Sequence, residues 1–135
     1  MDNRKILVVD DEADMRIFVS TVVATRGYEP VTASDGTAAL DLARKEPPAL
    51  VILDVMMPKI NDGILTYRQF RTDGKLQRIP IIMLSALAQK TFFHTIRMLN
   101  PPRGRTIPEP QAYMEKPPDA YELIRLIDEL LAAKA

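Results

Sequence analysis

The sequence predicts an α/β protein: a doubly wound, five-stranded parallel sheet in the order 2-1-3-4-5, with helices on both faces. Five short apolar runs alternate with five segments of helical periodicity, and such alternation favours right-handed crossovers between parallel strands. The run LVIL at 50–53 is continuously apolar, as in strands buried on both faces. Pro30 removes a hydrogen-bond donor from the second run, which therefore belongs at a sheet edge and gives the predicted order.

The first half of the chain supplies three strands and two helices. Residues 5–9 (KILVV) are the first strand, and apolar residues at helical spacing predict a helix over 13–26, ended by a glycine. A short strand follows at 28–33. A second helix, 37–45, begins after a Ser-Asp-Gly turn and is stopped by two prolines before the third strand, which is the apolar run already named.

Turn residues come next in the chain. Asn-Asp-Gly at 61–63 supplies turn chemistry, and a third helix is expected over about 64–71, with Leu65 and Phe70 facing inward. The apolar run at 79–84 predicts the fourth strand.

The last third combines a helix, a long loop, a strand and a final helix. Residues 88–99 keep helical periodicity, whereas the proline-rich segment at about 100–111 is predicted to be an extended loop. A short strand at 112–115 precedes Asp119, which with Glu122 makes a start signal resembling a capping box. The chain is thus expected to be a single domain, 1–135, with one extended loop.

Composition limits the classes of function. Lys plus Arg and Asp plus Glu both number 18, so no overall field favours nucleic acid or an anionic membrane surface. The absence of cysteine excludes disulfides and thiolate chemistry. No apolar stretch is long enough for a membrane span, and the N-terminal run is too short for a signal peptide. We therefore expect a cytoplasmic protein with no direct nucleic-acid or membrane partner.

Chemically active side chains follow the predicted strands. Asp10 and Asp11 follow the first strand, Asp54 the third, Ser85 the fourth and Lys116 the fifth. Because parallel strands end at the same edge, these groups should share one crevice. Clustered carboxylates repel, and an all-oxygen donor set suits Mg²⁺. A carboxylate nucleophile, a metal, a hydroxyl and a lysine together predict a phosphoryl-acceptor site.

Nearly the whole chain resembles a receiver domain of two-component response regulators, which has a flavodoxin-like sheet. Four strand-end motifs in the right order carry the resemblance: Asp10-Asp11, Asp54 followed by Met57-Pro58 and Gly63, Ser85-Ala86, and Tyr113 with Lys116-Pro117.

The resemblance implies roles for the acidic residues. Asp54 would accept a phosphoryl group from a kinase phosphohistidine and form an acyl phosphate. Asp11 would bind Mg²⁺ directly and Asp10 largely through water, with Asp54 and the Met56 carbonyl completing the protein ligands.

It also implies roles around the fifth strand. Ser85 and Lys116 would bind phosphoryl oxygens, and Tyr113 would be the aromatic switch residue that changes rotamer when Ser85 moves. A cis peptide bond is expected between Lys116 and Pro117.

The loop at 100–111 departs from the family pattern. It is about nine residues longer than the short turn that receivers use between the fourth helix and fifth strand. One interpretation is a tolerated surface insertion. The hypothesis we favour is that this proline-stiffened loop sets partner choice or self-association and leaves the chemistry unchanged.

The sequence is compatible with three classes of function, which differ in the residues that each requires. The leading hypothesis is a stand-alone receiver that catalyses only its own phosphorylation and dephosphorylation. Its partners would be a sensor histidine kinase or histidine phosphotransfer protein and an output protein, and it would be a monomer or a phosphorylation-dependent dimer. A haloacid-dehalogenase-like phosphatase would need an acid where this chain has Met56. A pseudo-receiver scaffold would not need the complete set of acids, hydroxyl and lysine.

Some residues near these motifs have simpler interpretations. Glu12 is expected to be a solvated acid in the first turn of a helix, where it favours the dipole, rather than a metal ligand. The only histidine, His94, is expected at the surface. Taken without the family pattern, Tyr113 would be a half-buried strand residue.

Overall fold

A computed structural model describes residues 4–56, 60–99 and 108–132 of the chain. The strands are β1 (Lys5–Val9), β2 (Glu29–Ala33), β3 (Leu50–Asp54), β4 (Ile81–Ser85) and β5 (Ala112–Glu115). The helices are α1 (Ala13–Thr25), α2 (Gly36–Lys45), α3 (Ile60–Thr72), α4 (Gln89–Leu99) and α5 (Ala120–Ala132). Strands and helices alternate along the chain, as the sequence predicts.

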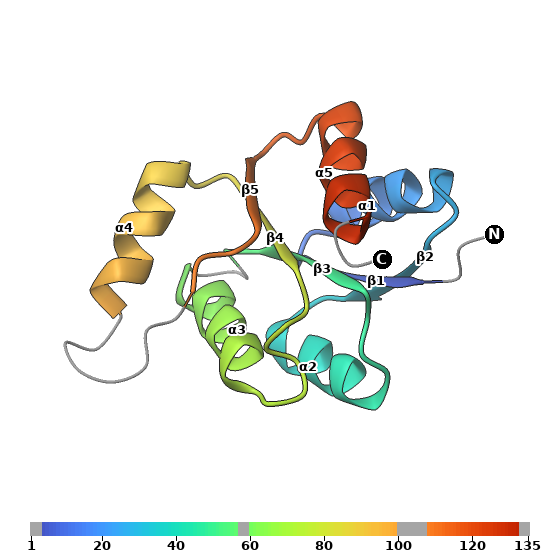
Figure 1. Ribbon diagram of the computed structural model, residues 1–135. Coiled ribbons are helices and arrows are strands. Elements are labelled where there is room, and N and C mark those ends of the chain that lie inside the picture. The colour runs from blue at the N-terminus through green and yellow to red at the C-terminus, as the bar shows by residue number, and fades with distance from the viewer. Residues whose placement is uncertain (1–3, 57–59, 100–107, 133–135) are drawn as a thin grey trace.

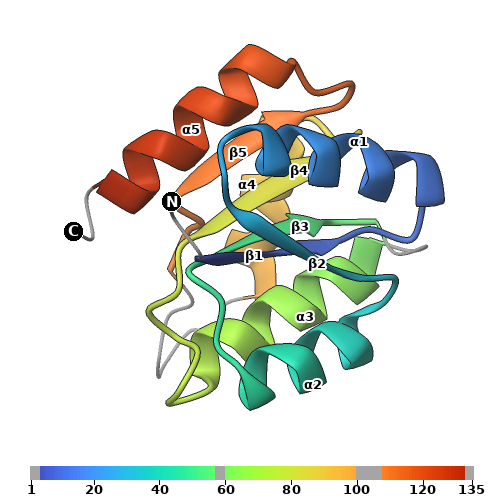
Figure 2. The same ribbon diagram turned by 90° about the vertical axis from the view of Figure 1, so that its right-hand side faces the viewer.

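The five strands form one parallel sheet in the order β2-β1-β3-β4-β5. This confirms the predicted order and the edge position of the strand that contains Pro30. Figure 1 and Figure 2 show α1 and α5 on one face of the sheet and α2 and α3 on the other, with α4 beside the edge strand β5. The sheet is therefore the middle of three layers.

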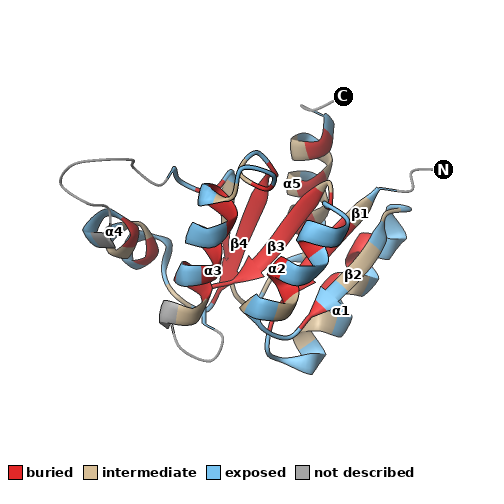
Figure 3. Cartoon of the chain, turned by 90° about the horizontal axis from the view of Figure 1, so that it is seen from below, coloured by how far each residue is buried: buried red, intermediate tan, exposed pale blue. Residues whose placement is uncertain are grey.

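The sheet divides the core into two clusters because neighbouring strand residues point to opposite faces. In β3, Leu50 and Ile52 belong to the cluster that contains buried residues of α1 and α5, whereas Val51 and Leu53 belong to the cluster that contains buried residues of α2, α3 and α4. Figure 3 shows the buried strands enclosed by helices whose outer sides are exposed. Strands with apolar residues on both faces account for the continuous apolar runs in the sequence.

Helix α3 differs from the prediction. It begins at Ile60 rather than about Ile64, so the Asn-Asp-Gly segment at 61–63 is helical and not a turn. Gly63 is required for packing: a Cβ atom there would lie 2.0 Å from the backbone oxygen of Val55. The expectation that Leu65 faces inward is also wrong, because this side chain is 54% exposed. Phe70 is buried, as predicted.

Within the described ranges, no helix is both long and apolar enough to span a membrane.

Candidate functional site

Four strands place the predicted site residues at one edge of the sheet. Asp54 is the last residue of β3 and Ser85 the last of β4, while Asp10 follows β1 and Lys116 follows β5. Asp10, Asp54 and Ser85 are buried, each 2% exposed or less. The register sets Asp54 beside Leu84 and Ser85 beside Glu115, so the strand ends lie side by side.

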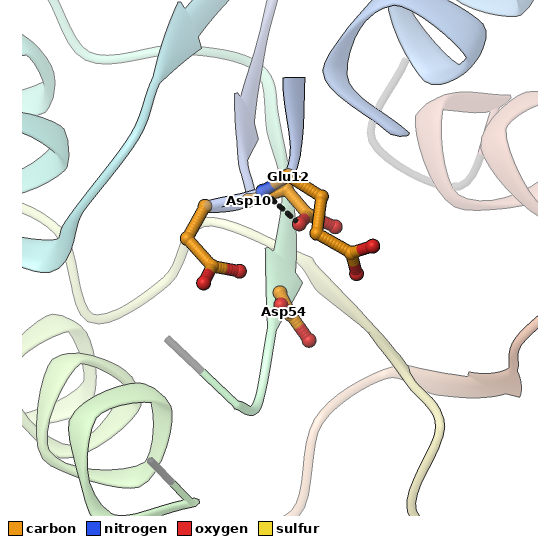
Figure 4. A group of neighbouring side chains, drawn as sticks. Asp10, Glu12 and Asp54 are labelled. Carbon is orange, nitrogen blue, oxygen red and sulfur yellow. Dashed lines mark hydrogen bonds between the residues drawn. The ribbon is translucent and has the colours of Figure 1, made fainter. Parts of the chain in front are cut away.

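Four carboxylates gather there. Asp10, Asp11, Glu12 and Asp54 each offer one oxygen atom, and these atoms all lie within 4.8 Å of one another. Figure 4 shows Asp10 and Glu12 from the end of β1 directed toward the same space as Asp54 from the end of β3. Asp11 and Glu12 are exposed, whereas Asp10 and Asp54 are buried, so the cluster reaches from the protein interior to solvent.

Asp10 is held by contacts on both its backbone and its side chain. Its Oδ1 accepts a hydrogen bond from the backbone N–H of Glu12 at 2.9 Å. Its backbone oxygen accepts one from Arg16 Nη1 at 2.7 Å, and its backbone N–H donates to Ala33. These bonds fix the direction in which the chain leaves β1.

Lys116 lies among the carboxylates. Its Nζ is 2.9 Å from Asp10 Oδ2, 3.1 Å from Glu12 Oε1 and 3.5 Å from Asp54 Oδ2. Burial disfavours the charged ammonium, but the hydrogen bond to Asp10 and the charge of Asp54 outweigh it and raise the pKa of Lys116. The lysine therefore stays charged and partly neutralises the cluster.

The Asp54 carboxyl has a strongly perturbed acidity. Burial and the neighbouring Asp10 charge raise its pKa to about 7, although Lys116 and the backbone N–H of Met56 act in the opposite direction. That N–H donates to Asp54 Oδ1 at 3.2 Å. Additional positive charge beside this carboxyl would lower its pKa and favour the ionised form at neutral pH.

The donor set fits Mg²⁺. Every candidate ligand is a carboxylate oxygen, and a hard divalent cation prefers such oxygens and retains several waters. A cation among these oxygens would relieve the repulsion that raises the pKa of Asp54. The described residues thus include an acidic cluster of the kind at which receiver domains generally bind Mg²⁺. The ligand roles expected for Asp10, Asp11, Asp54 and the Met56 carbonyl stay predictions.

Ser85 and Tyr113 are linked through one loop residue. The backbone N–H of Leu87 donates to Ser85 Oγ at 3.1 Å, and the Tyr113 hydroxyl donates to the Leu87 backbone oxygen. Burial raises the pKa of Tyr113 to about 12, so its hydroxyl stays protonated. The half-buried ring packs against Phe92, with ring centroids 4.9 Å apart. Through Leu87 and Tyr113, these contacts connect the Ser85 hydroxyl to Phe92 of α4.

Other predictions near the site are confirmed or concern residues that the structure does not describe. The Lys116–Pro117 peptide bond is cis, as expected. His94 is exposed, as expected. Met57 and Pro58 of the family motif lie outside the described residues, as do residues 100–107 of the long loop.

Sequence reasoning missed the contact between Glu12 and Lys116. Glu12 precedes α1 and its side chain is 63% exposed, in line with a solvated acid. It nevertheless binds Lys116 and belongs to the acidic cluster. The available signal was the third acid in the Asp-Asp-Glu run, directly after a buried strand.

This sheet, with an acidic cluster, a hydroxyl and a lysine at its strand ends, defines a receiver-type domain of two-component signalling. The model of the response regulator receiver domain family matches residues 6–100, and the chain belongs to this family. The match ends where the long loop begins.

Curated relatives include regulators and a kinase. The chain is 50% identical over 91 residues to the probable transcriptional regulator ycf27 of Porphyra purpurea, which covers 66% of this chain and 36% of the relative. It is 32% identical over 133 residues to the sensor histidine kinase TmoS of Ectopseudomonas mendocina, which covers 98% of this chain and 12% of the relative. The chain thus spans about a third or less of the length of these two relatives.

Solved structures share the fold over almost the whole chain. The chemotaxis protein CheY4 of Vibrio cholerae has a TM-score of 0.78 at 27% identity, with 96% of this chain and 99% of that chain covered. A putative response regulator from Chloroflexus aurantiacus has a TM-score of 0.79 at 26% identity, with 97% and 99% covered.

Proposed function

We propose that this receiver domain is a phosphorylation-activated switch in which Asp54 accepts a phosphoryl group. The donor would be the phosphohistidine of a sensor histidine kinase or of a histidine phosphotransfer protein. The observation that carries the proposal is the placement of buried Asp54 beside Asp10, with Lys116 Nζ 3.5 Å from its carboxylate. A buried carboxylate with a cation at this distance is suited to nucleophilic attack on phosphorus.

In the transfer step, an Asp54 oxygen forms a bond to phosphorus as the phosphorus–nitrogen bond of phosphohistidine breaks. The electron pair of that bond returns to the imidazole, which takes a proton from solvent. Lys116 and the Ser85 hydroxyl then bind phosphoryl oxygens. Mg²⁺, held by Asp11, Asp54, the Met56 carbonyl and, through water, Asp10, would neutralise charge on the carboxylates and the phosphoryl group. Water reverses the modification by hydrolysing the acyl phosphate.

The output would follow from movement at Ser85. A phosphoryl oxygen that draws in the Ser85 hydroxyl alters its bond with the Leu87 backbone, to which Tyr113 donates. Tyr113 would then change its position against Phe92 of α4. The domain would signal by docking an output protein in the cytoplasm and would transform no metabolite. The role of the loop at 100–111 in partner choice or self-association stays a prediction.

Acetyl phosphate with Mg²⁺, followed by intact mass measurement, tests the proposal. We expect one labile phosphoryl group in the wild type, none without Mg²⁺, and none in Asp54→Asn. Asp14→Asn is the matched control, because Asp14 is an exposed acid of α1 outside the cluster. Undiminished labelling of Asp54→Asn would refute the assignment of the acceptor.

A further inference from the structure

Glu12 stands at the N-cap of α1, but its side chain does not cap the helix. Its backbone N–H donates to Asp10 Oδ1 at 2.9 Å, which fixes its position next to the buried aspartate (Figure 4). Its Oε1 accepts a hydrogen bond from Lys116 Nζ at 3.1 Å. The side chain therefore extends over the acidic cluster to the lysine.

The ammonium group of Lys116 has three N–H donors and three carboxylate neighbours. Asp10 and Asp54 have side chains that are each 3% exposed, whereas that of Glu12 is 63% exposed. A phosphoryl group on Asp54 introduces oxygens that require the same donors. Glu12 is the neighbour that water can best solvate once the lysine leaves it.

We propose that Glu12 is a positioning residue that holds Lys116 in the unphosphorylated site and releases it when Asp54 is phosphorylated. This inference rests on the proposed function. With acetyl phosphate as donor, an Asp54 oxygen bonds to phosphorus, the phosphorus–oxygen bond to acetate breaks, and acetate leaves with the electron pair. Lys116 exchanges Glu12 Oε1 for a phosphoryl oxygen.

The contact therefore stabilises the unphosphorylated site alone. Its loss should accelerate phosphorylation of Asp54 by about two- to fivefold, as expected for an ion pair with one exposed partner. The rate of acyl phosphate hydrolysis should not change, because the contact is already broken in that state.

Three variants separate the contact from net charge. Glu12→Gln removes the charge, and Glu12→Asp keeps it on a side chain one methylene shorter. Asp14→Asn removes an equivalent charge two residues further along, in the first turn of α1 and outside the acidic cluster. Both Glu12 variants should be phosphorylated faster than wild type, and Asp14→Asn at the wild-type rate.

A measurement without metal or phosphate tests the contact itself. Urea unfolding in EDTA of wild type, Glu12→Gln, Lys116→Met and the double variant gives their coupling in a double-mutant cycle. We expect a stabilising coupling of about two- to fivefold in the unfolding equilibrium constant, and none between Asp14→Asn and Lys116→Met.

Zero coupling between Glu12 and Lys116 would overturn the inference. So would equal acceleration in Glu12→Gln and Asp14→Asn with a wild-type rate in Glu12→Asp, because net charge would then explain the effect. A wild type that acetyl phosphate does not label would refute the proposed function. The coupling measured in EDTA would still report on the contact in that case.

Discussion

Arg71 of α3 donates a hydrogen bond from Nη2 to the side-chain oxygen of Gln111, the residue before β5. The guanidinium is buried, with Arg71 only 3% exposed. Its other bonds reach the Tyr67 hydroxyl and the backbone oxygens of Gln77 and Ile79. Gln111 also accepts from the backbone N–H of Ile81 at 2.8 Å. One buried cation thus joins α3, the start of β4 and the end of the long loop.

Replacement of Arg71 by lysine should destabilise the protein by about 2 to 3 kcal/mol, since a lysine cannot reproduce the planar set of donors and leaves buried acceptors unpaired. Urea unfolding provides the measurement. Arg68→Lys, at an exposed position of the same helix, should change stability by less than about 0.5 kcal/mol. Equal effects of the two substitutions would show that the buried bonds contribute nothing specific.

The raised pKa of Asp54 predicts a pH dependence of stability in metal-free protein. The folded pKa, about 7, lies above the ordinary value of 3.8, so the folded state binds more protons between these values. The resulting stability is complete below about pH 4 and is lost as the pH rises through about 7. Its slope is at most about 1.4 kcal/mol per pH unit.

Unfolding in EDTA between about pH 5 and 8 should therefore show a steeper loss of stability in wild type than in Asp54→Asn. Asp14→Asn should follow the wild-type curve. Parallel curves for wild type and Asp54→Asn would contradict the shifted acidity of this carboxyl.

Magnesium should stabilise the fold through the acidic cluster. A ligand that binds only the folded state at ten times its Kd contributes about 1.4 kcal/mol. Asp11→Ala should melt at a higher temperature than wild type without metal, because one repelling charge is gone, and should respond less to Mg²⁺. Thermal melts with and without Mg²⁺ test this, and equal responses in both proteins would place the ion elsewhere.

Gly63→Ala should disturb the segment that follows Asp54. The new Cβ atom would lie 2.0 Å from the Val55 backbone oxygen, so backbone must move. We expect a loss of about 1 to 3 kcal/mol on urea unfolding and slower labelling by acetyl phosphate. Gly74→Ala is the control, because a Cβ there meets nothing within 4 Å. Normal labelling of Gly63→Ala would show that the segment tolerates the shift.

The strands and the strand-end residues could be predicted because their signals are local. A continuous apolar run predicts a strand buried on both faces, and parallel strands bring Asp10, Asp54, Ser85 and Lys116 to one edge. The start of α3 could not be predicted in this way. Gly63 is read locally as a turn residue, yet the fold requires it for the close approach of a helix to the Val55 oxygen.

The burial of Arg71 and the long-range contacts of charged side chains could not be predicted from the sequence either. Arg71 lies in the last turn of a helix, where an arginine usually faces solvent and complements the helix dipole. Its partners lie up to 40 residues away, and no local pattern reveals them. The contact of Glu12 with Lys116 spans 104 residues and was hidden for the same reason.

The aromatic contacts of Tyr113 give the unlabelled protein a spectroscopic signal that depends on the position of this ring. The sequence has four tyrosines and no tryptophan. Tyr67 is fully buried and Tyr121 is 84% exposed, whereas Tyr113 is half-buried against Phe92 and donates to Leu87. A rotamer change of Tyr113 would alter the chiral surroundings of an aromatic ring that absorbs in the near ultraviolet. Near-ultraviolet circular dichroism of unlabelled protein can therefore follow the proposed switch, with Tyr113→Phe retaining the ring and removing the bond to Leu87.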